Sequence, residues 1–363
     1  MKIRDAYARY PLVTMVCAFA LAGACSGAVR GSALAAQAAS TAFAAVVVML
    51  LIGLLVPQSF GRLGGRLPGV RILGGSDGRL TDSPSSHGLD IRFALSRMFH
   101  VKHYVLLMLA AAVGGAWSMA NGAAGGMLSL SVADLVERGA LVLLLCAATA
   151  VFEEGLFRGI VVPCVIEHVR SEKRSEERPG IEAESELGEK SRSERLRASP
   201  ALVAAVFSAL VFGILHVSGS LDGSSLSQII LAGGAFDSPA ECASAFALVP
   251  TPACAAPVPT LVLVFVAQAL LKALQAGLFG FCMAAVFLET GSIKQPVVIH
   301  AVFNVLYLGP LLVATGAVPA TYLTGNCGDL AVLALTIALL LPPSVKSARW
   351  LAREVVPYSS FRQ

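Results

Sequence analysis

One stretch of the sequence places three ionisable residues close together among apolar neighbours. Glu153, Glu154 and Arg158 lie in the segment VFEEGLFRG at 151–159. Glu154 and Arg158 are four residues apart, so on a helix they share a face and can form an ion pair. Glu153 is rotated by about 100° from Glu154, which leaves its carboxylate free to face the interior of a helical bundle. We expect Glu153 to act as a general base on water, and a purely structural ion-paired motif is the alternative.

Two further polar pairs occur in other apolar segments. Phe212 and His216 are four residues apart in FGILH, and His300 and Asn304 are four residues apart in HAVFN. The members of each pair therefore share a helix face. Imidazole and amide N–H groups one turn apart are the kind of donors that an oxyanion on a scissile carbonyl needs. A histidine satisfied within the core, and polar contacts that join helices, are the alternatives.

The three patterns occur in one order, Glu-Glu-x-x-x-Arg, then Phe-x-x-x-His, then His-x-x-x-Asn. This order resembles the CPBP intramembrane proteases, which include the type II CAAX prenyl endopeptidases and the bacterial Abi and bacteriocin-processing proteins. The segments EEGLFRG at 153–159 and LETGSIKQP at 288–296 are similar to family sequence as well. The resemblance covers about residues 140–316, and the combined pattern is specific where each part alone is not.

The resemblance implies a role for each residue that matches the family pattern. Glu153 would activate the hydrolytic water, and His216 would assist it. His300 and Asn304 would bind the oxyanion. The remaining motif positions, which would orient the site, are Glu154 and Arg158.

We therefore expect an intramembrane endopeptidase that hydrolyses a membrane-embedded or membrane-associated peptide or protein. No cofactor is expected, although Glu153, His216 and His300 have side chains of the types that hold a divalent cation such as zinc. The sequence has no His-Glu-x-x-His helix, which disfavours the usual zinc protease arrangement. A non-catalytic bacteriocin-immunity protein and a proton-coupled transporter are the alternatives, and the absence of an internal repeat disfavours transport.

The composition predicts an all-α polytopic bundle. The chain is 56% hydrophobic and 14% charged, with a mean hydropathy of +0.75, whereas soluble domains carry about 25% charged residues. Nothing in the sequence suggests a nucleic-acid partner. A transmembrane helix needs about 20 apolar residues, and about eight segments approach this: Pro11–Val29, Ala38–Pro57, Tyr104–Asn121, Ala140–Ile166, Ala201–Ser218, Pro259–Leu288, Pro296–Gly316 and Leu330–Pro342.

The distribution of basic residues predicts that both termini are cytoplasmic, in a multi-pass protein of a bacterial plasma membrane. All but four of the 27 Lys and Arg residues then fall on the inner side or in the inner connectors, as the positive-inside rule requires. The exceptions are Arg30, Arg138, Arg158 and Lys272.

Three regions follow from this pattern. Residues 1–137 hold three helices and a basic connector, 138–316 the catalytic core, and 317–363 the last helix and a basic tail. The core contains a charged insert at 167–198 and an outer connector at 219–258, in which Cys242 and Cys254 are candidates for a disulfide bond.

One difficulty concerns depth in the membrane. In straight helices Glu153 and His300 fall toward the cytoplasmic half, whereas His216 lies about 15 residues along its helix. For the three side chains to meet, the helix of His216 must tilt or begin later than residue 201.

Overall fold

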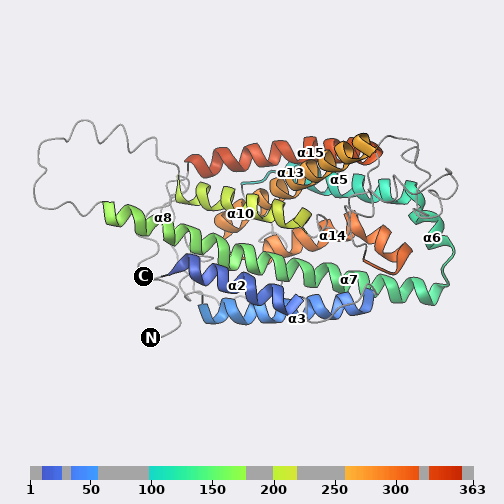
Figure 1. The fold of residues 1–363 in the computed structure, drawn as a ribbon, viewed down its shortest axis with the longest axis horizontal. Coiled ribbons are helices and arrows are strands. Elements are labelled where there is room, and N and C mark those ends of the chain that lie inside the picture. The colour runs from blue at the N-terminus through green and yellow to red at the C-terminus, as the bar shows by residue number, and fades with distance from the viewer. Residues whose placement is uncertain are drawn as a thin grey trace, which may run out of the picture.

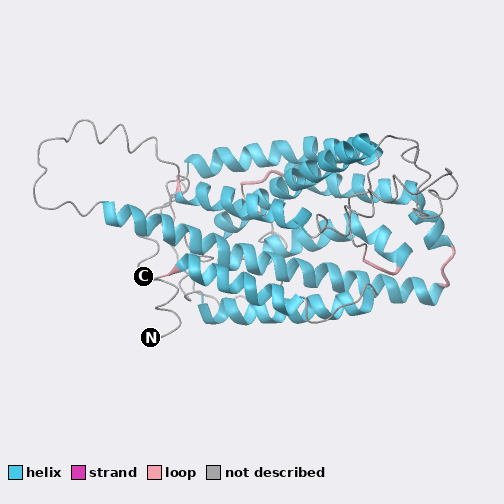
Figure 2. Cartoon of the chain, viewed as in Figure 1, coloured by secondary structure: helices cyan, strands magenta, loops and turns pink. Residues whose placement is uncertain are grey.

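The computed structural model describes residues 10–26, 34–55, 98–176, 199–218, 258–318 and 327–353. Every element in these ranges is helical, which confirms the all-α prediction (Figure 2). The elements are α2 (Pro11–Ser26), α3 (Leu34–Leu55), α5 (Val101–Ser118), η2 (Met119–Ala123), α6 (Ala124–Leu128), α7 (Val132–Glu154), η3 (Gly155–Val161), α8 (Val162–Glu176), α10 (Pro200–Ser218), α13 (Val258–Thr290), α14 (Lys294–Thr315) and α15 (Cys327–Arg353).

The long helices run roughly along the long axis of the molecule, with α2 and α3 on one side and α13, α15 and α5 on the other (Figure 1). Helix α7 packs between α3 and α14, and α14 packs between α7 and α5. On the far side α13 contacts both α10 and α15. The three polar patterns predicted from the sequence therefore lie on helices of a single bundle.

Among the described residues, seven helices are long and apolar enough to cross a bilayer, and they match seven of the eight predicted spans. The first predicted span forms α2, whose 16 residues fall short of the usual length. Only 28–44% of each span is buried, and large apolar side chains such as Val105 and Leu263 are exposed. Exposed apolar side chains on these helices are compatible with contact with lipid and not with water. The chain is therefore a multi-pass membrane protein.

The last helix is longer than the sequence indicated. The predicted span ends at Pro342, yet α15 continues through Pro342 and Pro343 to Arg353. The two prolines remove two backbone N–H donors. The predicted end of the helix therefore falls where the backbone hydrogen bonds are interrupted. The prolines leave the carbonyls of Ala338 and Leu339 without their usual donors, and in the next turn the hydroxyl of Ser344 donates to the Leu340 carbonyl at 2.8 Å. The predicted boundary at Pro342 is wrong, because packing against α13 and α5 stabilises α15 on both sides of the two prolines.

Helix α14 is fixed at its far end by α7. Arg138 of α7 donates from Nη1 to the carbonyl oxygens of Val313 and Ala314, at 3.2 and 3.1 Å. These carbonyls belong to the last turn of α14, where a cation is favourable. Gly316 ends the helix with a φ of 68°, a conformation that glycine adopts without strain. Arg138, predicted to lie on the outer side, thus fixes the end of the helix that carries His300.

The depth difficulty is resolved by the turn between α13 and α14. Helix α10 begins at Pro200, so the alternative of a later start is wrong, and His216 lies about 24 Å along it. Glu153 is comparably deep, because α7, η3 and α8 continue to Glu176 (Figure 1). Ile293, which starts α14, lies beside Gly159, well before the end of α8. The turn is therefore set back into the bundle, and the start of α14 reaches the depth of the other two helices.

The charged insert is described only as far as Glu176, where its first residues extend α8. The rest of the insert, the outer connector and both Cys242 and Cys254 lie outside the described residues. The orientation of the termini stays a prediction.

Helices α10 and α13 approach most closely at Gly213, one residue after Phe212. A Cβ atom at this position would overlap the backbone oxygen of Ala273. A backbone oxygen cannot rotate away as a side chain can, so glycine is required for this helix approach.

We predict that Gly213→Ala lowers the stability of the protein. Alanine favours helix by about 1 kcal/mol over glycine, but overpacking typically costs about 1–3 kcal/mol, so the net effect is a loss. Thermal unfolding of the purified protein in detergent measures it. Gly139→Ala on α7 is the matched control, because nothing lies within 4 Å of its added Cβ. Equal melting temperatures for the two variants would contradict the close approach.

Candidate active site

A π-helical segment positions the glutamates. Helix α7 ends at Glu154, and η3 then runs from Gly155 to Val161 before α8 resumes the α-helical pattern. Pro163 follows directly and has no N–H to donate to the carbonyl four residues earlier. Widening of the helix just before a proline is one way to accommodate this loss. Short π segments occur often at functional sites, and this one begins immediately after the two carboxylates.

The two glycines of η3 form the contact with α3. A Cβ atom at Gly155 would lie 2.6 Å from Cγ1 of Val48, and one at Gly159 would lie 2.5 Å from Cδ1 of Ile52. The GxxxG pattern therefore allows close approach between helices of one chain. It holds the back of η3 against α3 and turns the opposite face toward α10, α13 and α14.

Glu154 and Arg158 form the ion pair expected from their spacing. Nε of Arg158 lies 3.0 Å from Oε2 of Glu154, and both side chains are 0% exposed. Nη2 of Arg158 donates to the Gly280 carbonyl of α13 at 2.6 Å, and its guanidinium carbon lies 5.0 Å from the centre of the Phe212 ring of α10. A buried charge is tolerated only with such partners, so Arg158 ties η3 to both α10 and α13.

The other oxygen of Glu154 holds His300. Nδ1 of His300 lies 2.7 Å from Oε1 of Glu154. Because the carboxylate paired with Arg158 accepts hydrogen bonds, Nδ1 carries the proton, and Nε2 of the neutral ring is an acceptor. This contact was not expected from the sequence, and it gives Glu154 the task of fixing the tautomer of His300.

His216 is fixed in the same way by its own helix. Its Nδ1 lies 2.8 Å from the carbonyl oxygen of Phe212, which can only accept, so Nδ1 again carries the proton. The imidazole also lies against the Phe212 ring, at 4.2 Å between centroids. The shared face of Phe212 and His216 therefore orients the ring and leaves Nε2 as an acceptor.

Both acceptor nitrogens face one oxygen of Glu153. Oε2 of Glu153 lies 3.7 Å from Nε2 of His216 and 3.6 Å from Nε2 of His300. This oxygen is buried and has no hydrogen-bond partner among the described residues. The Glu153 side chain is 20% exposed and that of His216 is 30% exposed, compared with 3% for His300. The site is therefore closed on the side of Glu154 and more open beside Glu153 and His216.

Asn304 lies one turn after His300 on α14 and is half-buried. In the part of the chain that the structure describes, its amide makes no hydrogen bond with the glutamates or histidines. The structure thus gathers Glu153, Glu154, Arg158, His216 and His300 in direct contacts and leaves Asn304 at their edge.

Three of the site residues, Glu153, His216 and His300, have side chains that can bind a metal ion. Among the described residues no group of three or more His, Cys, Asp or Glu side chains is arranged to hold a metal ion. Glu153, His216 and His300 are of the donor types that bind a divalent cation such as zinc, so the expectation that the protein uses no metal stays a prediction.

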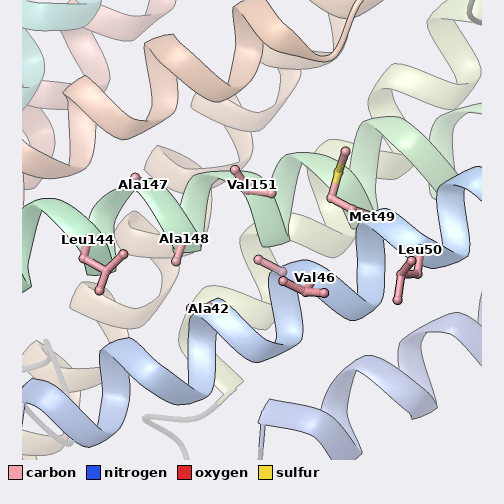
Figure 3. Close-up of a pocket in the computed structure, with 9 residues that line it drawn as sticks. Ala42, Val46, Met49, Leu50, Leu144, Ala147, Ala148 and Val151 are labelled. Atoms are coloured by element: carbon pink, nitrogen blue, oxygen red, sulfur yellow. The ribbon is translucent and has the colours of Figure 1, made fainter.

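An open apolar pocket lies on the bundle surface between α3 and α7 (Figure 3). Its volume is about 420 Å³, and it ends at Val151, two residues before Glu153. The lining residues are Ala42, Ala45, Val46, Met49, Leu50, Leu144, Ala147, Ala148 and Val151. Because none of them is polar, the pocket suits hydrocarbon and offers no group for catalysis.

Comparison with known families supports the resemblance seen in the sequence. Residues 136–306 match the model of the family described as type II CAAX prenyl endopeptidase Rce1-like. Over this region the chain is similar to that family. The match confirms the family predicted from the sequence, and it contains all six predicted site residues. No curated protein and no solved structure matches the chain.

Two features of the candidate active site were not predicted from the sequence. The first is the hydrogen bond between Glu154 and His300, which are 146 residues apart, so no local spacing indicates it. The second is the π-helical segment, for which Pro163 was an available signal.

We predict that Arg158→Met destabilises the protein by roughly 3–5 kcal/mol, because it leaves Glu154 buried without its counter-charge. Adding Glu154→Gln should recover part of this loss, since the uncompensated charge is then removed. Thermal unfolding of the single and double variants tests the coupling. Arg349→Met, at an exposed position of α15, is the control. A double variant that is no more stable than Arg158→Met would rule out this account.

Proposed function

We propose that the protein is an intramembrane endopeptidase that hydrolyses a peptide bond with a water molecule activated by Glu153. The observation that carries the proposal is the convergence of three hydrogen-bond acceptors: the Glu153 carboxylate and the Nε2 atoms of His216 and His300. Acceptors at 3.6 and 3.7 Å are too far apart for direct hydrogen bonds. A water molecule can bridge such a separation, and its two O–H groups can donate to two of these three acceptors.

In the first step the water oxygen attacks the scissile carbonyl carbon while Glu153 takes one of the water protons. Nε2 of His216 accepts the second water hydrogen and keeps the attacking lone pair directed at the carbonyl. The proton on Glu153 is then delivered to the amide nitrogen as the C–N bond breaks, so the amine leaves neutral. The products are a carboxylic acid and an amine, and no cofactor is consumed.

The oxyanion of the tetrahedral intermediate needs donors. The side-chain amide of Asn304 supplies one. His300 becomes a donor when the proton that Glu153 has taken from the water moves to its Nε2, and Glu154 then stabilises the imidazolium, much as a carboxylate does in a serine protease triad. The proton returns through Glu153 to the leaving nitrogen. Arg158 supplies the counter-charge of the Glu154 carboxylate. The roles implied by the family resemblance therefore have a physical basis in the contacts of these residues.

The proposed substrate is a membrane-embedded or membrane-associated peptide. The catalytic groups lie among apolar helices of a multi-pass protein, so a soluble chain would have to leave water to reach them. The family description names CAAX prenyl endopeptidases, which favours a lipid-modified or strongly apolar peptide. We also propose a bacterial plasma membrane as its location, because the chain is compact and rich in alanine, and its charge distribution predicts that both termini are cytoplasmic.

We predict that Glu153→Gln lowers kcat by about 10²–10⁴-fold, since the amide keeps the shape of the side chain but cannot take a proton. His300→Ala should cause a comparable loss. Cleavage of a quenched membrane-peptide library by the full-length protein in detergent measures both effects. Glu137→Gln, at an exposed position of the same helix, should retain full activity. Retention of activity by Glu153→Gln would refute the proposed general base.

The same cleavage assay, repeated with a chelator, distinguishes a metal-free protease from a metal-dependent one and from a non-catalytic binding protein. Activity that is unaffected by the chelator supports a glutamate-activated water. Loss that zinc restores would make Glu153, His216 and His300 metal ligands. If wild-type protein cleaves nothing while both variants still support the cellular phenotype, the protein is a binding or immunity factor.

A further inference from the structure

A cluster of basic side chains lies where the start of α5 packs beside the last part of α15. Lys102 and His103 belong to the first turn of α5, and Lys346 of α15 lies within electrostatic range of His103. Both lysines are exposed, and no ion pair joins either of them to an acidic side chain among the described residues. Two ammonium groups and an imidazole are therefore close together at one end of the bundle.

The start of α5 adds backbone donors to these side chains. The N-cap residue, His100, makes no side-chain cap hydrogen bond, and the first turn contains no acidic residue. Val101, the first residue of the helix, is 71% exposed. The first N–H groups of a helix have no partner within it, and together with the helix dipole they favour an anion such as phosphate. This helix start is therefore open to an anion and has no anion of its own.

His103 is a second, independent observation that points to a ligand. Its side chain is only 6% exposed, yet its Nδ1 is buried and makes no hydrogen bond with any described residue. The ring is held between Phe99 and His100, at 5.6 and 6.1 Å between ring centroids. A buried polar atom without a partner is uncommon, and a bound water or ion commonly accounts for one. A fixed imidazole beside two ammonium groups suits an oxygen-rich anion.

The charge pattern of α15 places the cluster at the membrane surface. Between Asp329 and Lys346 this helix carries no charged side chain, and the stretch corresponds to about 25 Å. The hydrocarbon core of a bilayer is about 30 Å thick, so Lys346 lies at its boundary and its long side chain can reach the headgroups. Arg349 and Arg353 follow at spacings of three and four and are exposed, so they continue the same face. This end of α15 therefore lies at the level of the lipid phosphates.

One acidic residue near the cluster is bound to the backbone. A carboxylate oxygen of Glu289, at the end of α13, accepts a hydrogen bond from the N–H of Met98, three residues before α5 begins. The positive charges of Lys102, Lys346 and Arg349 outnumber this carboxylate, so the cluster still favours an anion. The same hydrogen bond joins the start of α5 to the turn that leads into α14, the helix of the catalytic histidine.

We propose that Lys102, His103 and Lys346, together with the first turn of α5, bind the phosphate of an anionic phospholipid. The two ammonium groups pair with phosphate oxygens, and the N–H groups of the first turn and of the imidazole donate to them. The acyl chains lie along the exposed apolar face of α5 that carries Val105 and Leu109. This apolar face directly below the cluster favours a lipid over a free phosphate ion. The inference does not depend on the proposed endopeptidase function.

Quenching of tryptophan fluorescence by brominated lipid tests the site in the full-length protein. The chain has two tryptophans, and Trp350 lies one turn after Lys346 on the same face, so Trp117→Phe leaves Trp350 as the only reporter. The protein is placed in phosphatidylcholine vesicles that contain a small fraction of brominated phosphatidylglycerol or, for comparison, of brominated phosphatidylcholine. We expect phosphatidylglycerol to associate beside Trp350 about tenfold more strongly, because each basic residue near the surface contributes about 1 kcal/mol. Lys102→Gln and Lys346→Gln should each lower this preference about fivefold.

The controls separate a built site from the general attraction between a basic protein and an anionic surface. Lys294→Gln, at the exposed start of α14, removes the same charge outside the cluster and should preserve the preference. His103→Phe keeps an aromatic ring against Phe99 and should reduce it. The same titrations on protein that retains Trp117 guard against misfolding of the Trp117→Phe variant.

Two results would overturn the proposal. The first is an equal association of the two brominated lipids, or a preference that the three lysine variants lower equally. The second concerns the source of the phosphate. Millimolar inorganic phosphate in the buffer should leave the quenching unchanged, whereas displacement of the brominated lipid by it would assign the site to a soluble anion.

Discussion

The buried ion pair of Glu154 and Arg158 sets the requirements that the surrounding helices meet. Neither charge is exposed, and a buried charge is stable only when its remaining hydrogen-bonding groups also find partners. Arg158 satisfies this through the carbonyl of Gly280 on α13, and Glu154 through His300 on α14. One pair therefore fixes the relative positions of η3, α13 and α14 more specifically than apolar packing does.

This pair also determines what the exposed part of the site can do. Because Glu154 accepts a hydrogen bond from Nδ1–H of His300, the ring presents an acceptor nitrogen toward Glu153, and the Phe212 carbonyl does the same for His216. Two fixed tautomers then face one carboxylate oxygen. Such an arrangement is unfavourable unless a donor lies among the three atoms. The Glu154–Arg158 pair thus favours binding of a water molecule among these acceptors, and the proposed reaction uses that water.

The sequence predicted those features that depend on local spacing. The helical phase separated Glu153 from Glu154, and the four-residue spacings of Glu154 with Arg158 and of Phe212 with His216 correspond to contacts in the structure. Features set by distant segments were not predicted. The depth of His300 depends on a turn set back into the bundle, and the length of α15 depends on neighbours that hold it across Pro342 and Pro343. Residue spacing within one segment carries no information about the depth of His300 or about the length of α15.

The rigidity of helix α14 matters for function, because this helix holds His300 beside Glu153. It carries His300 and Asn304 near one end and Tyr307 farther along the same face. Arg138 binds the carbonyls of its last turn, and Glu154 binds His300 near its start, so both ends are fixed to the same continuous helix of α7 and η3. A distance held by one helix varies little with thermal motion, whereas a loop would let it drift. His300 is therefore held beside Glu153 by a helix that is fixed near both ends, so the geometry of the catalytic groups is preserved as the protein moves.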